Sequence, residues 1–390
     1  MTIRPRVLVC GTSFGRVYLR AVHDDPTVEL AGVLSRGSQA SHRYADAYGV
    51  PCYRAPDELP DDIDIACVVV RAGVAGGSGA ELSQRLMARG IHVLQEHLLH
   101  PKELSDCLRV ARRHEVRFRV NSFYPHVAAV RRFLLAAQAM RRRQPPLFVD
   151  AMAGVQVLYP LLDVIARAVG GPRPWRFADP APAPPALDEL ARVPSPYTHL
   201  HGVVGGTPVS LRVQNHIHPA DPDNHALLLH RLSLVFESGV LTLADTHGPV
   251  LWSPRMHSER DGTGRLIMAG PGTERLQVPG TEPVGEGTGP TFREVFDRVW
   301  PDAVRVALGE LRADIADEQR SARAGQWALT VAGMWQDLTG RLGEPRFVHP
   351  RSPERVDLPE LVAAEAILEE DPSASGAASR TEAAPRAVLR

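Results

Sequence analysis

Residues 91–101 have the sequence Ile91-His92-Val93-Leu94-Gln95-Glu96-His97-Leu98-Leu99-His100-Pro101. The apolar beginning is typical of a buried strand, and a proline after such a run is typical of the first position of a helix. A strand that leads into a helix is the repeating unit of α/β folds, and ligands bind there at the carboxyl ends of the strands. Glu96 and His97 occupy such an end, so we expect both side chains to face a ligand.

Strand-like runs and helical patterns alternate through the first third of the chain. The apolar runs are Arg6–Cys10, Val28–Leu34, Asp64–Val70, Ile91–Gln95 and Arg117–Asn121. Helical patterns lie between them at Phe14–His23, Gln39–Tyr48, Ser78–Arg89 and Pro101–His114. Parallel strands need crossover connections of this kind. The alternation therefore predicts an α/β fold whose N-terminal part, residues 1–123, is a Rossmann dinucleotide-binding domain.

The pattern changes after Tyr124. Helices are predicted at Pro125–Arg142, Tyr159–Val169, Thr291–Leu311 and Ala322–Leu342, and residues 174–196 are predicted to form a surface connection rich in proline. Strands are predicted at Thr198–Val204, Pro208–Ile217, Leu227–Glu237, Val240–Ala244 and Val250–Trp252, with long loops over 254–290. This pattern favours a substrate-binding and dimerisation α+β domain over residues 124–350, with a mostly antiparallel sheet. Residues 351–390 are predicted to be an extension that is disordered from about residue 371.

Composition excludes several classes of protein. The chain has 390 residues and a net charge of −1, so no strong field favours nucleic acid or an anionic membrane. No apolar run approaches the ~20 residues of a membrane span. The four cysteines are scattered and fit buried thiols in a reducing compartment, which predicts a cytoplasmic protein. The histidines 216, 218, 225 and 230 surround an Asp-Pro-Asp-Asn turn, and their spacing matches no metal motif, so we expect no metal.

The first strand leads into Gly11-Thr12-Ser13-Phe14-Gly15. Glycine allows a close approach of backbone to a pyrophosphate, and the following helix offers free N–H groups. We therefore predict that residues Gly11, Thr12, Ser13 and Phe14 bind a dinucleotide. Because the spacing is G-x-x-x-G and not G-x-G-x-x-G, a merely structural tight turn is the alternative.

The end of the second strand indicates which dinucleotide is bound. An NAD site usually has an acidic residue here for the ribose 2′-hydroxyl. Residues 34–41 contain no acid but do contain Arg36, Ser38 and Ser41. A guanidinium with hydroxyl donors suits a 2′-phosphate, which favours NADPH over NADH. The alternative is a solvated turn.

Further candidates follow three other strand ends. Arg71 precedes a glycine-rich loop and fits either a ligand contact or a surface ion pair. Glu96 is expected near the cofactor, and His97 and Tyr124 are expected to face one cleft over the nicotinamide. His126 is a weaker candidate for contact with the substrate. Lys102 is the only lysine, so we expect no lysine in the active site.

These features resemble the glucose-fructose oxidoreductase / inositol dehydrogenase (Gfo/Idh/MocA) superfamily, in which Glu-Lys-Pro is common where this chain has Glu96-His97-Leu98. Several sequence segments more closely resemble those of thiazolinyl imine reductases of siderophore assembly. They are Gly11–Gly15 with Tyr18-Leu19, Ala66–Arg71, Val74–Gly77, His92–His97 with Leu99–Pro101, Phe123–His126, Asp221–Asp223 with His225, and Gly248–Ser253. The resemblance covers about residues 5–345.

The resemblance implies NADPH-dependent reduction of a thiazoline C=N to a thiazolidine. The substrate would be a thioester on a carrier domain of a nonribosomal peptide synthetase, and the enzyme would be a homodimer. The family's proposed proton donors fall on His97 and Tyr124, and either residue, or a bound water, fits the chemistry. Asp163 is a substrate candidate. Sugar dehydrogenases of the superfamily carry Asp-x-x-x-His, but here Asp163 is followed at that spacing by Arg167.

Two other functions are compatible with the sequence. One is an NAD(P)-dependent sugar or cyclitol dehydrogenase, which needs a base that only the His97 position supplies. The other is a non-catalytic accessory protein that binds NADP. The departure of the glycine loop from G-x-G-x-x-G slightly supports this interpretation. The residues leave open the acyl group beside the thiazoline, the stereochemistry and the oligomeric state.

Overall fold

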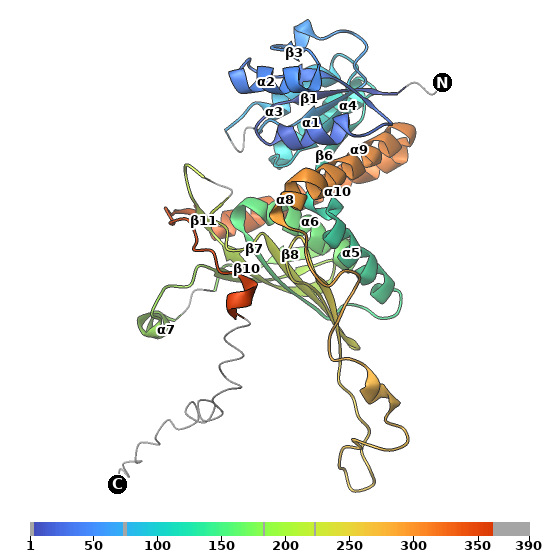
Figure 1. The fold of residues 1–390 in the computed structure, drawn as a ribbon, viewed down its shortest axis with the longest axis vertical. Coiled ribbons are helices and arrows are strands. Elements are labelled where there is room, and N and C mark those ends of the chain that lie inside the picture. Colours follow the sequence, from blue (N-terminus) through green and yellow to red (C-terminus); the bar gives the residue numbers. More distant parts are fainter. Residues whose placement is uncertain (1–3, 73–75, 182–183, 222–223, 362–390) are drawn as a thin grey trace. The chain divides into compact units, whose positions relative to one another are not determined.

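The computed structural model describes residues 4–72, 76–181, 184–221 and 224–361 (Figure 1). Residues 1–348 form one compact unit. Residues 349–390 form a second unit, of which 349–361 are described. The predicted disorder from about residue 371 therefore lies outside the described residues. Within the described ranges, no helix is both long and apolar enough to cross a membrane.

The first sheet is parallel and has the order β3-β2-β1-β4-β5-β6. Its strands are β1 (Arg6–Cys10), β2 (Glu29–Leu34), β3 (Cys52–Tyr53), β4 (Ile65–Val68), β5 (His92–Glu96) and β6 (Phe118–Asn121). The crossovers contain α1 (Gly15–His23), α2 (Gln39–Tyr48), α3 (Gly79–Met87) and α4 (Pro101–Arg113). This is the order of the Rossmann fold, whose ligand crevice lies where the strand order reverses, between β1 and β4. The predicted fold of this region is confirmed.

The second sheet has the order β15-β14-β13-β12-β7-β10-β9-β8. Its strands are β7 (Phe148–Gly154), β8 (Trp175–Phe177), β9 (Thr198–Val204), β10 (Thr207–Gln214), β12 (His230–Phe236), β13 (Gly239–Leu243), β14 (Val250–Pro254) and β15 (Glu282–Pro283). Only the β7–β10 pair is parallel, so the expectation of a mostly antiparallel sheet is confirmed. Helices α5 (Ala128–Arg141) and α6 (Leu158–Val169) pack against this sheet, and α6 is buried along nearly its whole length.

Further small elements lie outside these two sheets. A separate two-stranded sheet pairs β11 (His216–Ile217) with β16 (Arg346–Phe347), and α7 spans Pro185–Leu190. The predicted surface connection over 174–196 therefore contains both a short edge strand, β8, and a short helix.

The most important element missing from the sequence prediction is β7, which lies between β12 and β10. Its sequence, Phe-Val-Asp-Ala-Met-Ala-Gly, contains alanine, glycine and aspartate, which have low strand propensity. Pairing along both edges compensates for that composition. The helix predicted from Pro125 instead begins with a 3₁₀ turn at Tyr124–His126, and α5 starts at Ala128.

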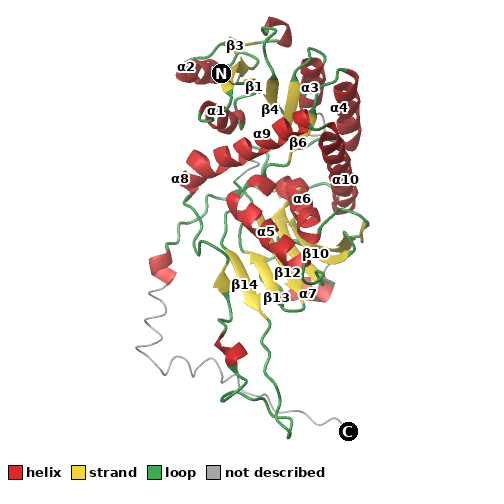
Figure 2. Ribbon diagram, turned by 90° about the vertical axis from the view of Figure 1, so that its right-hand side faces the viewer, coloured by secondary structure: helices red, strands yellow, loops and turns green. Residues whose placement is uncertain are grey.

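Helices from the end of the chain lie between the two sheets (Figures 1 and 2). They are α8 (Phe292–Glu294), α9 (Trp300–Ala316) and α10 (Glu318–Leu342). Helix α9 packs on α1, whereas α10 packs on α4, β6 and α6. The helix predicted over Thr291–Leu311 is divided into α8, a π-helical turn at Val295–Val299 and α9, which continues past Leu311 to Ala316, and α10 is longer than predicted. Helix α10 begins four residues earlier than expected because the Asp317 side chain accepts a hydrogen bond from the Arg320 N–H at 3.0 Å.

A buried ion cluster joins β6 to α9. The Arg119 guanidinium donates to the Asp314 carboxylate at 2.5 Å and also to Glu310. The side chains of Arg119 and Asp314 are only 11% and 1% exposed. Arg320 lies 3.0 Å from the other oxygen of Asp314. Because each charge has a partner of opposite sign, the cluster can be buried between the first sheet and the C-terminal helices.

We predict that Arg119→Ala lowers the free energy of unfolding by about 3 kcal/mol, because it leaves the buried Asp314 carboxylate and the partly buried Glu310 carboxylate short of a cation. Urea denaturation would measure this loss. Arg109→Ala, which removes an exposed partner of Asp106, is the matched control and should change stability little. Equal effects of the two variants would show that the buried cluster does not stabilise the fold.

Candidate active site

The geometry of the turn between β1 and α1 suits a phosphate group. Gly11 has a φ of +89°, and a β-carbon there would lie 2.7 Å from the Val69 carbonyl oxygen. No described side chain caps the first turn of α1, whose N-cap is Phe14, and this turn contains no acid. Its N–H groups and the positive end of its dipole are thus available to an anion. Thr12 and Ser13 lie in the same turn.

The end of β2 presents a group of hydroxyls. Ser38 caps α2 by accepting from the Ser41 N–H at 3.2 Å. The Ser41 hydroxyl lies 2.8 Å from that of Ser38 and 2.9 Å from that of Thr12. Two residues predicted for the 2′-phosphate are therefore linked to the phosphate turn, and the exposed Arg36 stands beside them.

Arg71 is exposed and lies three residues after the end of β4. Its carbonyl oxygen accepts from the Gly79 N–H at 2.8 Å, which closes the glycine-rich loop at the start of α3. Residues 73–75 of this loop lie outside the described residues.

Glu96 belongs to a buried polar chain beneath the edge of the sheet. The Tyr18 hydroxyl donates to the Glu96 carboxylate, and the Asn121 amide donates to the Tyr18 oxygen at 2.6 Å. Burial raises the pKa of Glu96 to about 8, even though the hydrogen bond from Tyr18 lowers it. Around neutral pH this carboxyl group is therefore mostly protonated. Tyr18 and Asn121 were not predicted as site residues, because their side chains meet Glu96 only in the folded chain.

His97 lies between Glu96 and α6. Its Nε2 is 3.4 Å from the Glu96 Oε1, and its ring stacks on that of Tyr159 at 5.8 Å between centroids, with 5° between the planes. Burial, with a contribution from nearby His230, lowers the pKa of His97 to about 4. The ring is therefore neutral around pH 7, and its orientation is fixed by the Tyr159 face and the Glu96 carboxyl group.

Tyr124 packs its buried ring edge-on against His230 at 4.7 Å between centroids. The two nitrogens of His230 lie 2.9 Å from the Thr246 hydroxyl and 3.0 Å from the Val157 carbonyl oxygen. Since a carbonyl only accepts, Nε2 carries the proton and Nδ1 accepts from Thr246. Burial lowers the pKa of His230 to about 4. This neutral histidine lies beside both predicted proton donors and brings His97 and Tyr124 into one cluster.

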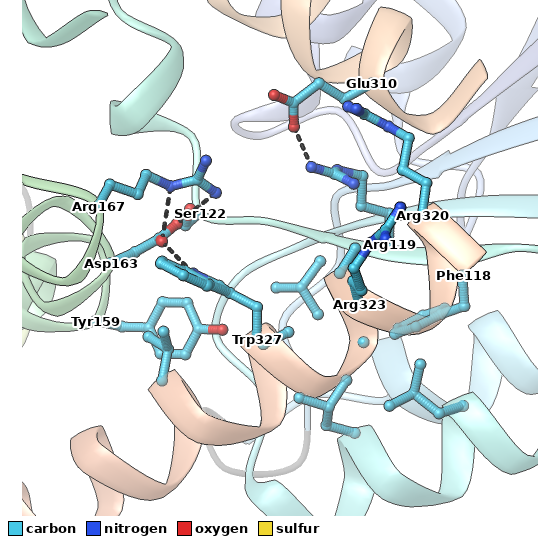
Figure 3. Close-up of a pocket in the computed structure, with 17 residues that line it drawn as sticks. Phe118, Arg119, Ser122, Tyr159, Asp163, Arg167, Glu310, Arg320, Arg323 and Trp327 are labelled. Atoms are coloured by element: carbon cyan, nitrogen blue, oxygen red, sulfur yellow. Dashed lines mark hydrogen bonds and ion pairs between the residues drawn. The ribbon is translucent and has the colours of Figure 1, made fainter. Parts of the chain in front are cut away.

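Asp163 and His126 lie in a charged region next to this cluster. Asp163 accepts from Trp327 and Arg167 at 2.7 and 2.8 Å and from the Ser122 hydroxyl (Figure 3). Burial favours a higher pKa for Asp163, but Arg167 and the other donors outweigh it and the pKa is lowered. His126 is 3.8 Å from Glu310 of the buried ion cluster, so it faces α9.

A cavity of about 420 Å³ opens beside these residues (Figure 3). Tyr159, Asp163 and Arg167 line one part of it, and α10 contributes Arg320 and Arg323. Because Tyr159 also stacks on His97, its ring separates the cavity from the histidine. Tyr159 was not predicted as a site residue, because in the sequence it marks only the expected start of a helix.

Of the four histidines that cluster in the sequence, His216 and His225 remain in contact, with 2.6 Å between the His225 Nε2 and the His216 carbonyl oxygen, whereas His230 lies beside Tyr124. His218 accepts from the backbone N–H groups of Ala220 and Asp221 at 3.1 Å, as expected for a turn. Residues 222–223 of that turn lie outside the described residues. The part of the chain that the structure describes contains no group of three or more His, Cys, Asp or Glu side chains arranged to hold a metal ion.

Comparison with known families supports the fold. Residues 5–122 match the model for the oxidoreductase family with an NAD-binding Rossmann fold, GFO_IDH_MocA. Residues 144–253 match the model for the C-terminal region of the Irp3-like thiazolinyl imine reductases. The protein is an NAD(P)-dependent oxidoreductase, and its two matched regions carry the Gfo/Idh/MocA dinucleotide-binding domain and the Irp3-like C-terminal domain. A search of curated proteins gave no match.

Solved structures show the same fold at low identity. KijD10, a 3-ketoreductase from Actinomadura kijaniata in complex with NADP, is 15% identical with a TM-score of 0.57, covering 89% of this chain and 100% of its own. GenD2 from gentamicin A biosynthesis, in complex with NAD, is 14% identical with a TM-score of 0.58, covering 86% and 93%. UDP-N-acetylglucosamine 3-dehydrogenase GnnA from Acidithiobacillus ferrooxidans is 14% identical with a TM-score of 0.56, covering 85% and 97%. At this identity the likeness concerns the fold alone.

The raised pKa of Glu96 predicts a pH dependence of stability. A glutamate in an unfolded chain titrates near pH 4.3, whereas Glu96 titrates at about 8 in the folded chain. In this window the folded state binds the extra proton, so the free energy of unfolding falls as the pH rises. We expect Glu96→Gln to show a smaller fall between pH 5 and 8 than the wild type in denaturant titrations. Glu237→Gln, at an exposed position, should keep the wild-type slope. A wild-type slope for Glu96→Gln would mean that the carboxyl group titrates normally.

Proposed function

We propose that this protein uses NADPH to reduce the C=N bond of a thiazoline to a thiazolidine. The substrate is a thioester on a carrier domain of a nonribosomal peptide synthetase, in a siderophore-type pathway in the cytoplasm. The observation that carries this proposal is the match of residues 144–253 to the Irp3-like thiazolinyl imine reductases, because this region packs against the predicted catalytic residues. The proposal also includes a homodimer and a division into domains at residues 123 and 124.

The donor groups of the first sheet support a dinucleotide. The free N–H groups of α1 and the close backbone at Gly11 suit a pyrophosphate, and Arg36, Ser38 and Ser41 suit a 2′-phosphate. The bound cofactor supplies a hydride to the imine carbon. The nitrogen then needs a proton, which the chain must hold close to it.

Tyr124 and His97 are the groups proposed to supply this proton. The low pKa of His97 leaves it neutral around pH 7, and a phenol is a stronger acid than a neutral imidazole. We therefore assign the immediate donation to the Tyr124 hydroxyl. In this scheme His97, held by Glu96 and Tyr159, orients the imine, and water restores the phenol proton. Arg71 is proposed to contact the cofactor, and His126 and Asp163 to border the substrate.

Oxidation of a sugar or cyclitol is less well supported. It requires a base near the reacting carbon. Arg167 occupies the position where the related sugar enzymes carry histidine, and Asp163 holds its guanidinium at 2.8 Å. A guanidinium remains protonated in proteins and is no base.

The substrate assay is the direct test of this function. We expect NADPH oxidation with a thiazolinyl thioester and no NADP⁺ reduction with inositol or hexoses. Carrier-bound substrate should be reduced more efficiently than a short thioester mimic, because remote contacts help to position the reacting carbon. Absorbance at the NADPH band would follow both directions. Turnover of a sugar with none of any thiazoline would replace the proposal with the dehydrogenase, and no turnover at all would favour a non-catalytic accessory protein.

Substitutions test the proposed proton donors. We expect Tyr124→Phe to lower kcat by about 10²–10⁴-fold, the usual cost of losing a general acid. His97→Ala should also lower kcat, because the imine is no longer oriented, and NADPH binding should stay close to the wild type in both variants. Single-turnover rates and cofactor titrations would separate the two effects. His257→Ala, at an exposed loop position, is the control for histidine loss. Near-normal turnover of the Tyr124/His97 double variant would refute the assignment.

A further inference from the structure

A second arginine reaches the proposed 2′-phosphate site from β3. This edge strand pairs in parallel with β2, with Leu34 opposite Tyr53, and the Ser35 N–H donates to the Tyr53 carbonyl oxygen at 3.0 Å. The chain therefore leaves β3 at Arg54, at the same carboxyl edge and beside the β2–α2 loop. Figure 1 shows β3 at the edge of the sheet next to α2.

The Arg54 side chain lies across this loop. Gly37 has a φ of +81°, and a β-carbon built on it would be 3.0 Å from the Arg54 Nε and 3.5 Å from its Cζ. The guanidinium thus passes over the backbone between Arg36 and Ser38. Only glycine at position 37 leaves this space without strain.

The charges around the loop leave both arginines available to an anion. Among the described residues, no carboxylate forms an ion pair with the Arg36 or Arg54 guanidinium. Glu58 contacts Arg54 through the backbone, because its carboxylate accepts from the Arg54 N–H at 2.8 Å. Arg36 and the Arg54 guanidinium thus both lie at the loop that leads to the paired hydroxyls of Ser38 and Ser41, and this arrangement suits a phosphate monoester.

We propose that Arg54 is a second cation for the 2′-phosphate of NADPH and that it shares this phosphate with Arg36. The inference rests on the proposed preference for NADPH. Part of the cofactor specificity would then come from β3, which follows α2 in the sequence. The residue that distinguishes NAD from NADP usually lies at the end of β2.

Binding measurements on the full-length protein test this assignment. NADPH, NADH and the fragments 2′,5′-ADP and 5′-AMP would be titrated into the wild type, Arg54→Ala, Arg54→Lys and Arg36→Ala, with protein fluorescence or calorimetry as the readout. We expect Arg54→Ala to weaken NADPH and 2′,5′-ADP about tenfold, the size of one charge-assisted contact, and to leave NADH and 5′-AMP within twofold. Arg54→Lys should retain part of the preference. Arg43→Ala, at an exposed position of α2, is the control and should bind all four ligands like the wild type.

The outcomes separate this inference from the cofactor proposal. A wild type that binds NADH as tightly as NADPH would refute the preference itself. A wild type that prefers NADPH, with Arg54→Ala unchanged or weakened equally for all four ligands, would refute the role of Arg54 alone. Thermal unfolding of each variant confirms that it is folded, so that lost affinity is attributable to the site.

Discussion

The ion cluster of Arg119 with Asp314 and Glu310 is the contact on which the site depends, because it ties the last strand of the first sheet to a helix from the end of the chain. Burial of these charges is favourable only while each has its partner. The pairing holds α9 against β6 and α1. It thereby keeps the cofactor strands in a fixed position relative to α6, which carries Tyr159 and Asp163.

The predicted catalytic residues lie among buried groups that are held in their neutral forms. His97, His126 and His230 all have their pKa lowered to about 4 by burial, while that of Glu96 is raised to about 8. The hydrogen bonds to Thr246 and Val157 fix the tautomer of His230, and the Tyr159 ring fixes the plane of His97. Under the proposed function, a hydride acceptor in this region would meet oriented dipoles and few mobile charges. Such preorganisation is the main means by which a protein stabilises developing charge.

Most of the first sheet could be predicted from the sequence, because runs such as Arg6–Cys10 and Arg117–Asn121 are short, apolar and bounded by helical patterns. The position of Glu96 and His97 at the ligand edge followed from the parallel connection alone. Strand β7 could not be predicted, since its alanines and Asp150 gain their strand conformation from β10 and β12 on either side. The contacts of Tyr18 with Glu96, of Tyr159 with His97 and of Arg54 with Gly37 join residues from different elements, and no local pattern in the sequence signals them.

The packing of α9 and α10 on the first sheet has a consequence for how the chain is made. When residue 121 leaves the ribosome, the helices α9 and α10 that pack on β6 are still some 180 residues from being synthesised. The outer side of β6 is therefore uncovered at this stage. An uncovered strand edge is a template for pairing with other chains. During synthesis there is therefore a long interval in which all six strands of the first sheet can pair, while β6 still lacks the helices that cover it. The same dependence means that these 121 residues are not a portable module, and grafting them onto another catalytic region would require a new cover for β6.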